Sequence, residues 1–400
     1  MVTAAQPLSA LSRPRAGAVR HLGPQWYATV MGTAILGTAG AALPVRPPGL
    51  RPLCAAFWAL SLVLLLGLLA ARALHWRRHR DRARAHLLDP ATAPFYGCLA
   101  MALLAVGGGA LTVGRDWIGV PAAVALDAVL FTVGTAVALA AAVAVPYLMA
   151  VRHRVQASEA TPVWLLPLVA PMVSAAVGPS LAPYLPAGQP RETLLFMCVA
   201  LCGLSLLATF VMLPLVFARL VTGGPLPLAL TPTLFLVLGP LGQSTTAVAR
   251  FAEVAPGVLS GPDGHGFAAV PVLPVLPALA ALAVLYGVPV MGFALFWLCL
   301  AAALVARARR NGMGFAMTWW AFTFPVGTCV TGAAALARHT GLVVYGLLAC
   351  ALYAALVAAW GVAAAHTVRG LLSGELLAAP RPAPAAPRPV TARTTSGAVR

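Results

Sequence analysis

Charged residues are scarce in this chain of 400 residues, and one kind is missing altogether. Only 9% of the residues are charged, whereas a soluble domain carries about 25%. Lysine does not occur, so all 26 basic residues are arginines, and they outnumber the 9 acidic residues. A chain that is 61% hydrophobic cannot cover a water-exposed surface with polar groups. The composition therefore excludes an ordinary soluble enzyme and a disordered chain, and it predicts an integral membrane protein.

Signatures of catalysis and of metal binding are also absent. The sequence has no HExxH, GxSxG or Walker motif and no GxGxxG loop after a strand, which leaves no nucleophile, base or phosphate loop to assign. Its 7 cysteines lie in apolar runs without a CxxC pair, so we expect packing residues rather than metal ligands. No basic stripe with interleaved aromatic residues indicates nucleic-acid binding. We therefore expect no enzyme activity, cofactor, metal site or nucleic-acid partner.

Ten apolar segments are long enough to cross a membrane as helices, which takes about 20 residues each. They cover approximately residues 24–43, 50–74, 94–113, 118–150, 162–185, 192–218, 232–251, 277–306, 315–337 and 341–371. The Pro- and Gly-rich stretch 253–276 is expected to be an outer loop that leads into the eighth span. Residues 1–21 and 373–400 are expected to be disordered cytoplasmic segments that flank a transmembrane domain at 22–372.

The odd-numbered spans begin at regular intervals. The first, third, fifth and seventh spans open on Pro24, Pro94, Pro162 and Pro232, at intervals of 70, 68 and 70 residues. The ninth span opens near Phe315, 83 residues further on. Fixed spacing of this kind indicates an internal repeat. The sequence therefore predicts an all-α membrane fold of five helical hairpins with the same orientation in the membrane.

The odd spans carry Gly or Pro near their middle, whereas the even spans consist mostly of Leu, Ala and Val. Proline removes a helix hydrogen bond, and in a membrane the freed backbone groups must be satisfied by protein or water. This contrast predicts that the odd helices surround a central pore and that the even helices lie outside them. The alternative is that Gly and Pro mark close packing between helices. The residues expected to line the pore are Gly32, Thr33, Gly108, Pro171, Ser174, Pro240, Gly242, Ser244, Thr245, Pro325 and Thr328.

Arginine placement predicts the orientation in the membrane. With the N-terminus inside, 20 arginines fall on the cytoplasmic side and 6 on the outer side. Because cytoplasmic loops carry the excess of basic residues, both termini are expected to be cytoplasmic in a plasma-membrane protein. The arginine-rich stretch 77–89 is expected to be a helix that rests on anionic lipid headgroups.

Carboxylates are almost missing from the predicted spans. Asp127 is the one candidate, and its place near the outer end of the fourth span predicts an interfacial position rather than a proton relay. A cation pathway would use acidic rings, whereas an anion pathway can use hydroxyls, backbone N–H groups and positive helix ends. The scarcity of carboxylates therefore favours anions.

The ninth span is the most informative stretch, WWAFTFPVGTCVTGA at 319–333. Phe324 stands directly before Pro325, so its ring can project into a pore and block it as a hydrophobic gate. The alternative is that Phe324 packs between helices. The residues alone leave these two possibilities open.

Three segments resemble the tellurite-resistance/dicarboxylate transporter family, which includes bacterial TehA channels, plant slow anion channels and fungal malate and sulfite permeases. They are WYATVMGTAIL at 26–36, PTLFLVLGPLGQSTTA at 232–247 and WWAFTFPVG at 319–327. The resemblance implies ten helices in five hairpins around a pore, often in a homotrimer, with a gating phenylalanine at the position of Phe324. It implies transport of a small inorganic anion or a C4-dicarboxylate. A proton-coupled dicarboxylate or sulfite permease or exporter stays open as the alternative.

Overall fold

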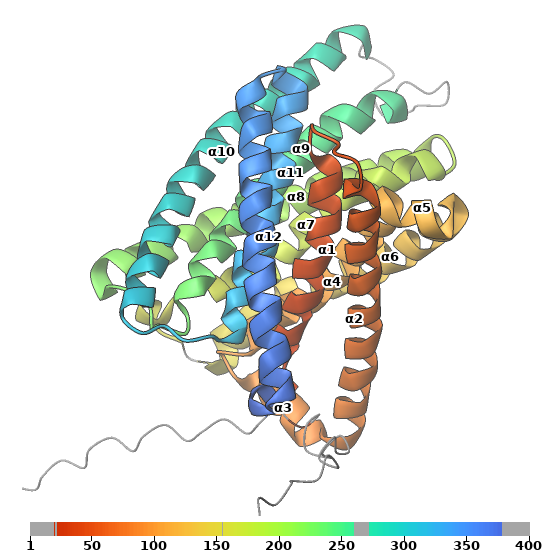
Figure 1. Ribbon diagram of the computed structural model, residues 1–400. Coiled ribbons are helices and arrows are strands. Elements are labelled where there is room, and N and C mark those ends of the chain that lie inside the picture. The colour runs from red at the N-terminus through yellow and green to blue at the C-terminus, as the bar shows by residue number, and fades with distance from the viewer. Residues whose placement is uncertain (1–19, 21, 154, 260–271, 378–400) are drawn as a thin grey trace, which may run out of the picture.

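The computed structural model describes residues 20, 22–153, 155–259 and 272–377. All regular secondary structure in these ranges is helical, which confirms the all-α prediction for this part of the chain (Figure 1). The long helices are α1 (Tyr27–Ala42), α2 (Leu50–Arg78), α4 (Tyr96–Gly109), α6 (Val120–Leu148), α7 (Leu165–Val177), α8 (Gln189–Gly223), α9 (Leu238–Leu259), α10 (Val272–Arg310), α11 (Phe324–Thr340) and α12 (Val343–Leu372). Two shorter helices are α3 (Arg80–Leu88) and α5 (Arg115–Ile118).

Eight helical segments of the described chain are long and apolar enough to cross a membrane. They are Leu50–Arg78, Ala93–Ile118, Val120–His153, Pro162–Tyr184, Gln189–Gly223, Pro277–Arg310, Met317–Thr340 and Val343–Leu372. The predicted spans 24–43 and 232–251 are not among them, because Gly, Thr, Ser and Gln lower the mean hydropathy of α1 and α9. Eight such segments indicate a multi-pass membrane protein.

Burial separates these segments into two groups. The most apolar windows of Ala93–Ile118, Pro162–Tyr184 and Met317–Thr340 are 83–89% buried within the protein, and those of the other five segments only 22–39%. Helix α1 belongs with the first group, since 12 of its 16 residues are buried. The inner and outer helices expected from the sequence therefore agree with the burial of these segments.

The inner helices contact one another in a closed order. Helix α1 packs against α4, α4 against α7, α7 against α9, α9 against α11, and α11 against α1. Each also packs against the long helix that follows it in the chain, so that α2, α6, α8, α10 and α12 lie on the outside. Figure 1 shows this arrangement around α1, which contacts both α2 and α12.

Every inner helix is preceded by a short 3-10 turn. These turns are η3 (Pro24–Trp26), η4 (Ala93–Phe95), η8 (Pro162–Trp164), η10 (Thr231–Val237) and η11 (Met317–Phe322). The prolines expected near the middle of the odd spans need correction here. Pro325 lies in the first turn of α11 and Pro240 is the third residue of α9, whereas Pro171 lies inside α7. A proline in the first turn of an α-helix replaces an N–H group that has no partner within that helix.

Several predicted boundaries also change. Helix α9 extends to Leu259, into the stretch expected to be an outer loop, and α10 begins at Val272 rather than near 277. Residues 260–271 of that loop lie outside the described residues, as do 1–19, 21 and 378–400 of the predicted disordered segments. The described part of the C-terminal segment contains one 3-10 turn, η12 (Glu375–Leu377).

The arginine-rich stretch is helical, as its sequence predicts. Helix α3 covers Arg80–Leu88 and contacts α2. Its interaction with lipid headgroups stays a prediction.

Candidate functional site

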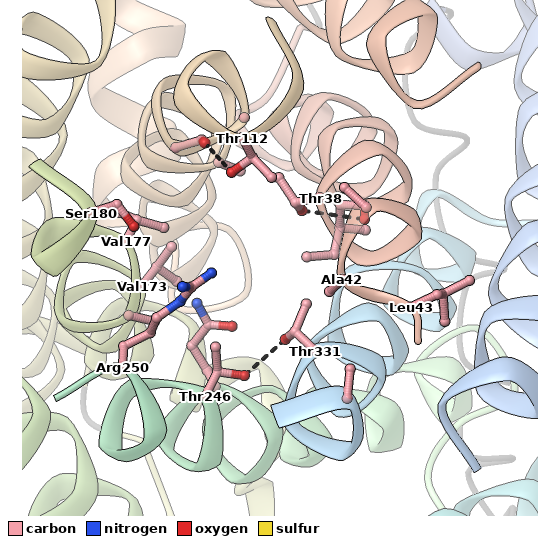
Figure 2. Close-up of a pocket in the computed structure, with 18 of the residues that line it drawn as sticks. Thr38, Ala42, Leu43, Thr112, Val173, Val177, Ser180, Thr246, Arg250 and Thr331 are labelled. Carbon is pink, nitrogen blue, oxygen red and sulfur yellow. Dashed lines mark hydrogen bonds between the residues drawn. The ribbon is translucent and has the colours of Figure 1, made fainter. Parts of the chain in front are cut away.

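A cavity of about 400 Å³ lies inside the ring of inner helices. Residues of α1, α4, α7, α9 and α11 all line it, together with the turns that follow α4 and α7. Figure 2 shows the polar side chains spaced around its opening, namely Thr38, Thr112, Ser180, Thr246 and Thr331, with Arg250 pointing inward. We call this cavity the vestibule.

The threonine hydroxyls of the vestibule already have hydrogen-bond partners. Thr112 Oγ1 donates to Gly108 O at 2.7 Å, and Thr246 Oγ1 lies 2.8 Å from Thr331 Oγ1. Each of these two hydroxyls also lies within hydrogen-bond distance of a carbonyl oxygen of its own helix, so the single proton of each has a partner inside the protein. A hydroxyl that donates to a carbonyl presents lone pairs to the cavity, so the hydroxyls expected to attract anions are poor donors in this arrangement.

Three cationic side chains add charged donors to this lining. Arg46, Arg250 and Arg338 line the vestibule, and its described lining includes no acidic residue. Glu253 lies beside two of these arginines. Its carboxylate is 3.0 Å from Arg250 Nη1 and 3.1 Å from Arg338 Nη2. His339 Nε2 lies 3.7 Å from the same carboxylate. The vestibule thus combines three guanidinium groups with one neighbouring carboxylate, an arrangement that favours anions.

A second cavity, of only about 10 Å³, is almost entirely apolar. Met31, Met101, Leu166 and Val169 contribute to its wall. Phe324 lines both this cavity, which we call the constriction, and the vestibule, and its side chain is 3% exposed. The Phe324 ring therefore forms the wall shared by a wide, polar space and a narrow, apolar one.

The lining residues repeat the three intervals of the opening prolines, 70, 68 and 70, and the fourth interval is 85 residues rather than 83. The constriction includes Met31, Met101, Val169, Gly239 and Phe324, at intervals of 70, 68, 70 and 85 residues. The vestibule includes Thr38, Gly108, Ala176, Thr246 and Thr331 at the same four intervals. Each inner helix thus contributes an equivalent position to each layer of the two cavities.

Three of the residues predicted to form the pore or its gate line these cavities. Gly108 and Phe324 line the vestibule, and Pro325 lines the constriction together with Phe324. The other predicted residues do not line either cavity. They are Gly32, Thr33, Pro171, Ser174, Pro240, Gly242, Ser244, Thr245 and Thr328.

The surroundings of several of these residues show contacts between helices. A Cβ atom on Gly32 would lie 2.3 Å from Thr323 Oγ1, and one on Gly242 would lie 2.4 Å from the carbonyl carbon of Thr328. Ser174 Oγ accepts a hydrogen bond from Thr135 in α6 at 2.9 Å. Such contacts support the alternative of close helix packing at these positions. A role in a pore stays a prediction for all nine.

Sequence reasoning missed the cationic residues, although a signal for them exists. Phe324, Thr331 and Arg338 are seven residues apart in α11, and Gln243 and Arg250 are seven apart in α9. Residues seven apart lie on one face of a helix, close to two full turns. Extending the face of Phe324 along α11 would have led to Thr331 and Arg338.

The second phenylalanine of the ninth span has a different environment. Phe322 stacks edge-to-face on Phe235, with ring centroids 4.9 Å apart, and also contacts Trp319. Phe324, two residues further along the chain, lines both cavities instead.

Metal-ligating side chains do not cluster in the described residues, where no group of three or more His, Cys, Asp or Glu could hold an ion. The arrangement is that of a multi-pass membrane protein whose inner helices surround a cationic cavity with Phe324 in its wall.

Comparison with known proteins identifies the class more closely. The profile of the voltage-dependent anion channel family matches residues 21–368. The chain therefore belongs to this family, which confirms the resemblance found in its three segments and makes it a membrane transport protein.

Two relatives match over most of their length. The chain is 26% identical over 363 residues to the sulfite efflux pump SSU1 of Arthroderma otae. The matched region covers 90% of this chain and 93% of that relative. It is 23% identical over 361 residues to the uncharacterized transporter MJ0576 of Methanocaldococcus jannaschii. The matched region covers 90% of this chain and 96% of that relative.

Proposed function

We propose that the chain conducts small anions across the plasma membrane through a pore along the axis of its inner helices, and that Phe324 is the gate. One observation carries this proposal: Phe324 lines both the vestibule and the constriction. An aromatic ring at this place keeps a hydrated ion from passing, and a change of its rotamer would join the two cavities.

The charge of the vestibule supports an anion as the substrate. Three arginines line it and the described lining contains no acid, so anions are concentrated there and cations are repelled. We propose a small inorganic anion or a C4-dicarboxylate. The relatives named sulfite efflux pump support sulfite as a member of this class.

We further propose that ten helices cross the membrane as five hairpins of the same orientation, with α1 and α9 joining the eight candidate spans. The closed contacts of the inner helices and the equivalent intervals of their lining residues support this arrangement. The arginine distribution supports cytoplasmic termini, which would place the vestibule on the outer side. The outer helices would contact membrane lipids, and a homotrimer is proposed from the family resemblance.

The gate is tested by anion flux into liposomes that contain the purified protein. Phe324→Ala should raise chloride or nitrate flux at least several-fold over wild type, because the truncated side chain no longer separates the two cavities. Phe322→Ala is the matched control, since Phe322 packs on Phe235 and lines neither cavity. Equal flux of wild type and Phe324→Ala at equal incorporation would reject the gate.

The alternative is a proton-coupled permease or exporter of dicarboxylates or sulfite. The observation that favours it is a buried carboxyl group, Asp127, in one of the outer helices. Malate or sulfite accumulation that collapses together with an imposed pH gradient would support the coupled mechanism. Flux that follows the electrical potential and ignores the pH gradient would support the channel.

A further inference from the structure

Asp127 is fully buried between helices, which its place near the outer end of the fourth predicted span does not reveal. It lies in α6, seven residues after Val120, which is about 10 Å along the helix axis. Its exposed fraction is 0%. A Cβ atom on Gly107 of α4 would lie 2.7 Å from Asp127 Oδ1. The carboxyl group therefore fills the space that the missing side chain of Gly107 leaves between the two helices.

Neither carboxyl oxygen of Asp127 makes a hydrogen bond to a described residue, and no ion pair within the described chain involves it. Four elements that pack against α6 carry titratable or charged side chains. These side chains are Tyr96 and Cys98 of α4, Arg115 and Asp116 of α5, Arg152 and His153 of η6 (Met149–His153), and Tyr184 of η9 (Gly178–Tyr184). Asp116 is instead paired with Arg51, 2.6 Å away. Asp127 thus has no described partner that would compensate a negative charge.

Packing alone does not require a carboxyl group at this position. At the intervals of 70 and 68 residues, the equivalent positions are Phe57 in α2 and Leu195 in α8. Both are apolar, and Leu195 is buried against its own inner helix. A buried, unpaired carboxylate is costly in a membrane, and such residues mark proton and ion pathways.

The segment opposite Asp127 forms a wall of the vestibule. Gly108 and Gly109 line that cavity, directly after Gly107. The helix then continues as a π-helix, η5 (Ala110–Gly114). A π-helical turn inside an α-helix is frequently found at functional sites. A charge that appears on Asp127 therefore acts on a glycine-rich, irregular part of the vestibule wall, one residue away from the cavity lining.

We infer that Asp127 is a proton-binding site whose protonation controls anion transport by this chain. The carboxylate takes up one proton to become the neutral acid, which suits the apolar contact between α4 and α6. Release of that proton leaves an unpaired charge against Gly107 and forces α4 and α6 to repack at the vestibule wall. This inference rests on the proposed transport function, so its test includes a measurement that does not depend on transport.

The first measurement is chemical labelling of the protonated acid in the reconstituted, full-length protein. A hydrophobic carbodiimide adds a protonated carboxyl group across its C=N bond, and the resulting O-acylisourea rearranges to a stable N-acylurea. Mass spectrometry should find the adduct on Asp127 at mildly acidic pH and progressively less of it as the pH rises. Asp116, which is ion-paired, should stay unlabelled. Absence of the adduct on Asp127 at every pH, or labelling that does not change with pH, would overturn the inference.

The second measurement is flux of nitrate or chloride, which bind no proton in the range tested, at equal pH on both sides of the liposome. Wild-type flux should change with pH, and Asp127→Asn should lose that dependence because its side chain is permanently neutral. Asp116→Asn is the matched control from the same helical hairpin and should follow wild type. An Asp127→Asn protein that keeps the wild-type pH response would contradict the inference.

The two measurements separate the inference from the proposed function. A wild-type protein without nitrate or chloride flux would count against the channel, whereas pH-dependent labelling of Asp127 would still support the proton site. If Asp127→Asn does not fold, Asp127→Glu keeps an ionisable group one methylene further out. It should shift the pH range of labelling, and an unchanged range would contradict the site.

Discussion

At the scale of single residues, Glu253 sets the charge of the vestibule. It accepts hydrogen bonds from Arg250 and Arg338, and so offsets part of the charge of two of the three arginines that line the cavity. Charge at the mouth of a cleft changes the local concentration of a charged substrate. Glu253 therefore limits how strongly the vestibule attracts anions.

Substitutions at this cluster should change anion flux in opposite directions. We expect Glu253→Gln to raise flux and Arg338→Gln to lower it, each by about two- to tenfold at low ionic strength. Both effects should shrink in concentrated salt, because the screening length falls to a few ångströms. The measurement is initial flux into liposomes at several salt concentrations. Arg51→Gln is the control, since Arg51 pairs with Asp116 and does not itself line the cavity. Salt-independent changes would contradict the electrostatic explanation.

The sequence identified Phe324 as a cavity residue but missed most of its neighbours. The reason is physical: Gly32, Gly242 and Thr328 were selected as residues that weaken helices or carry hydroxyls, properties that also suit close contacts between helices. Which face of a helix looks into a cavity depends on its rotation about its own axis. Residue type does not determine that rotation. The seven-residue spacing of Phe324, Thr331 and Arg338 does indicate it, because residues at this spacing share one face of the helix.

At the scale of helices, the backbones of α9 and α11 approach each other closely at Gly242. The Cβ that Gly242 lacks would lie 2.4 Å from the carbonyl carbon of Thr328 and 2.5 Å from the backbone nitrogen of Cys329. The obstacle is backbone, which cannot rotate out of the way. Gly242 is thus required for the close approach of the two helices.

Gly242→Ala should lower stability by about 1–3 kcal/mol, the cost of overpacking a closely fitted contact. Gly203→Ala is the matched control in α8, where an added Cβ meets nothing within 4 Å. The stability of the control should stay unchanged or rise by up to about 1 kcal/mol, because alanine has a higher helix propensity than glycine. Thermal unfolding of the detergent-solubilised protein measures both. Equal melting temperatures of wild type and Gly242→Ala would contradict the packing argument.

Helix starts were predicted well from local chemistry. Pro24, Pro94, Pro162 and Pro232 each stand at the beginning of a 3-10 turn before an inner helix, where proline's missing N–H costs nothing. The path of the chain beyond those starts depends on tertiary packing, and there Pro240 and Pro325 stand in the first turns of α9 and α11 rather than in the middle of these helices.

At the scale of the whole molecule, the arginine distribution predicts which ends of the helices face the cytoplasm. Exposed Ala187 precedes α8 at the end predicted to be outside, and exposed Ser158 lies between α6 and α7 at the end predicted to be inside. These two loops therefore provide a matched pair of positions for a topology measurement.

In intact cells, a membrane-impermeant maleimide should label Ala187→Cys and leave Ser158→Cys unlabelled until the cells are opened. Both substitutions belong in a Cys299→Ser background, because Cys299 is an exposed native cysteine. The reverse pattern would invert the proposed topology and place the vestibule on the cytoplasmic side. Labelling of both positions in intact cells would contradict a single orientation.

The all-α, multi-pass class of the molecule was predictable, because hydropathy can be read from the sequence without any knowledge of contacts. The spacing of residues along the chain cannot predict which side chains the neighbouring helices bury. Helices α1 and α9 are not among the candidate spans, although they pack in the ring of inner helices like α4, α7 and α11. Asp127 looks interfacial by its position along the chain, and only the tight contact with Gly107 shows it to be buried.

The constriction is an aperture assembled from one position in each of five inner helices. Met31, Met101, Val169, Gly239 and Phe324 occupy it, so the positions already differ in size from glycine to phenylalanine. Each of the five residues has its own codon, although all five line the same small cavity. If the helices descend from duplicated hairpins, evolution could widen or narrow that opening by one codon at a time, in any of five places, while the rest of the scaffold stays unchanged.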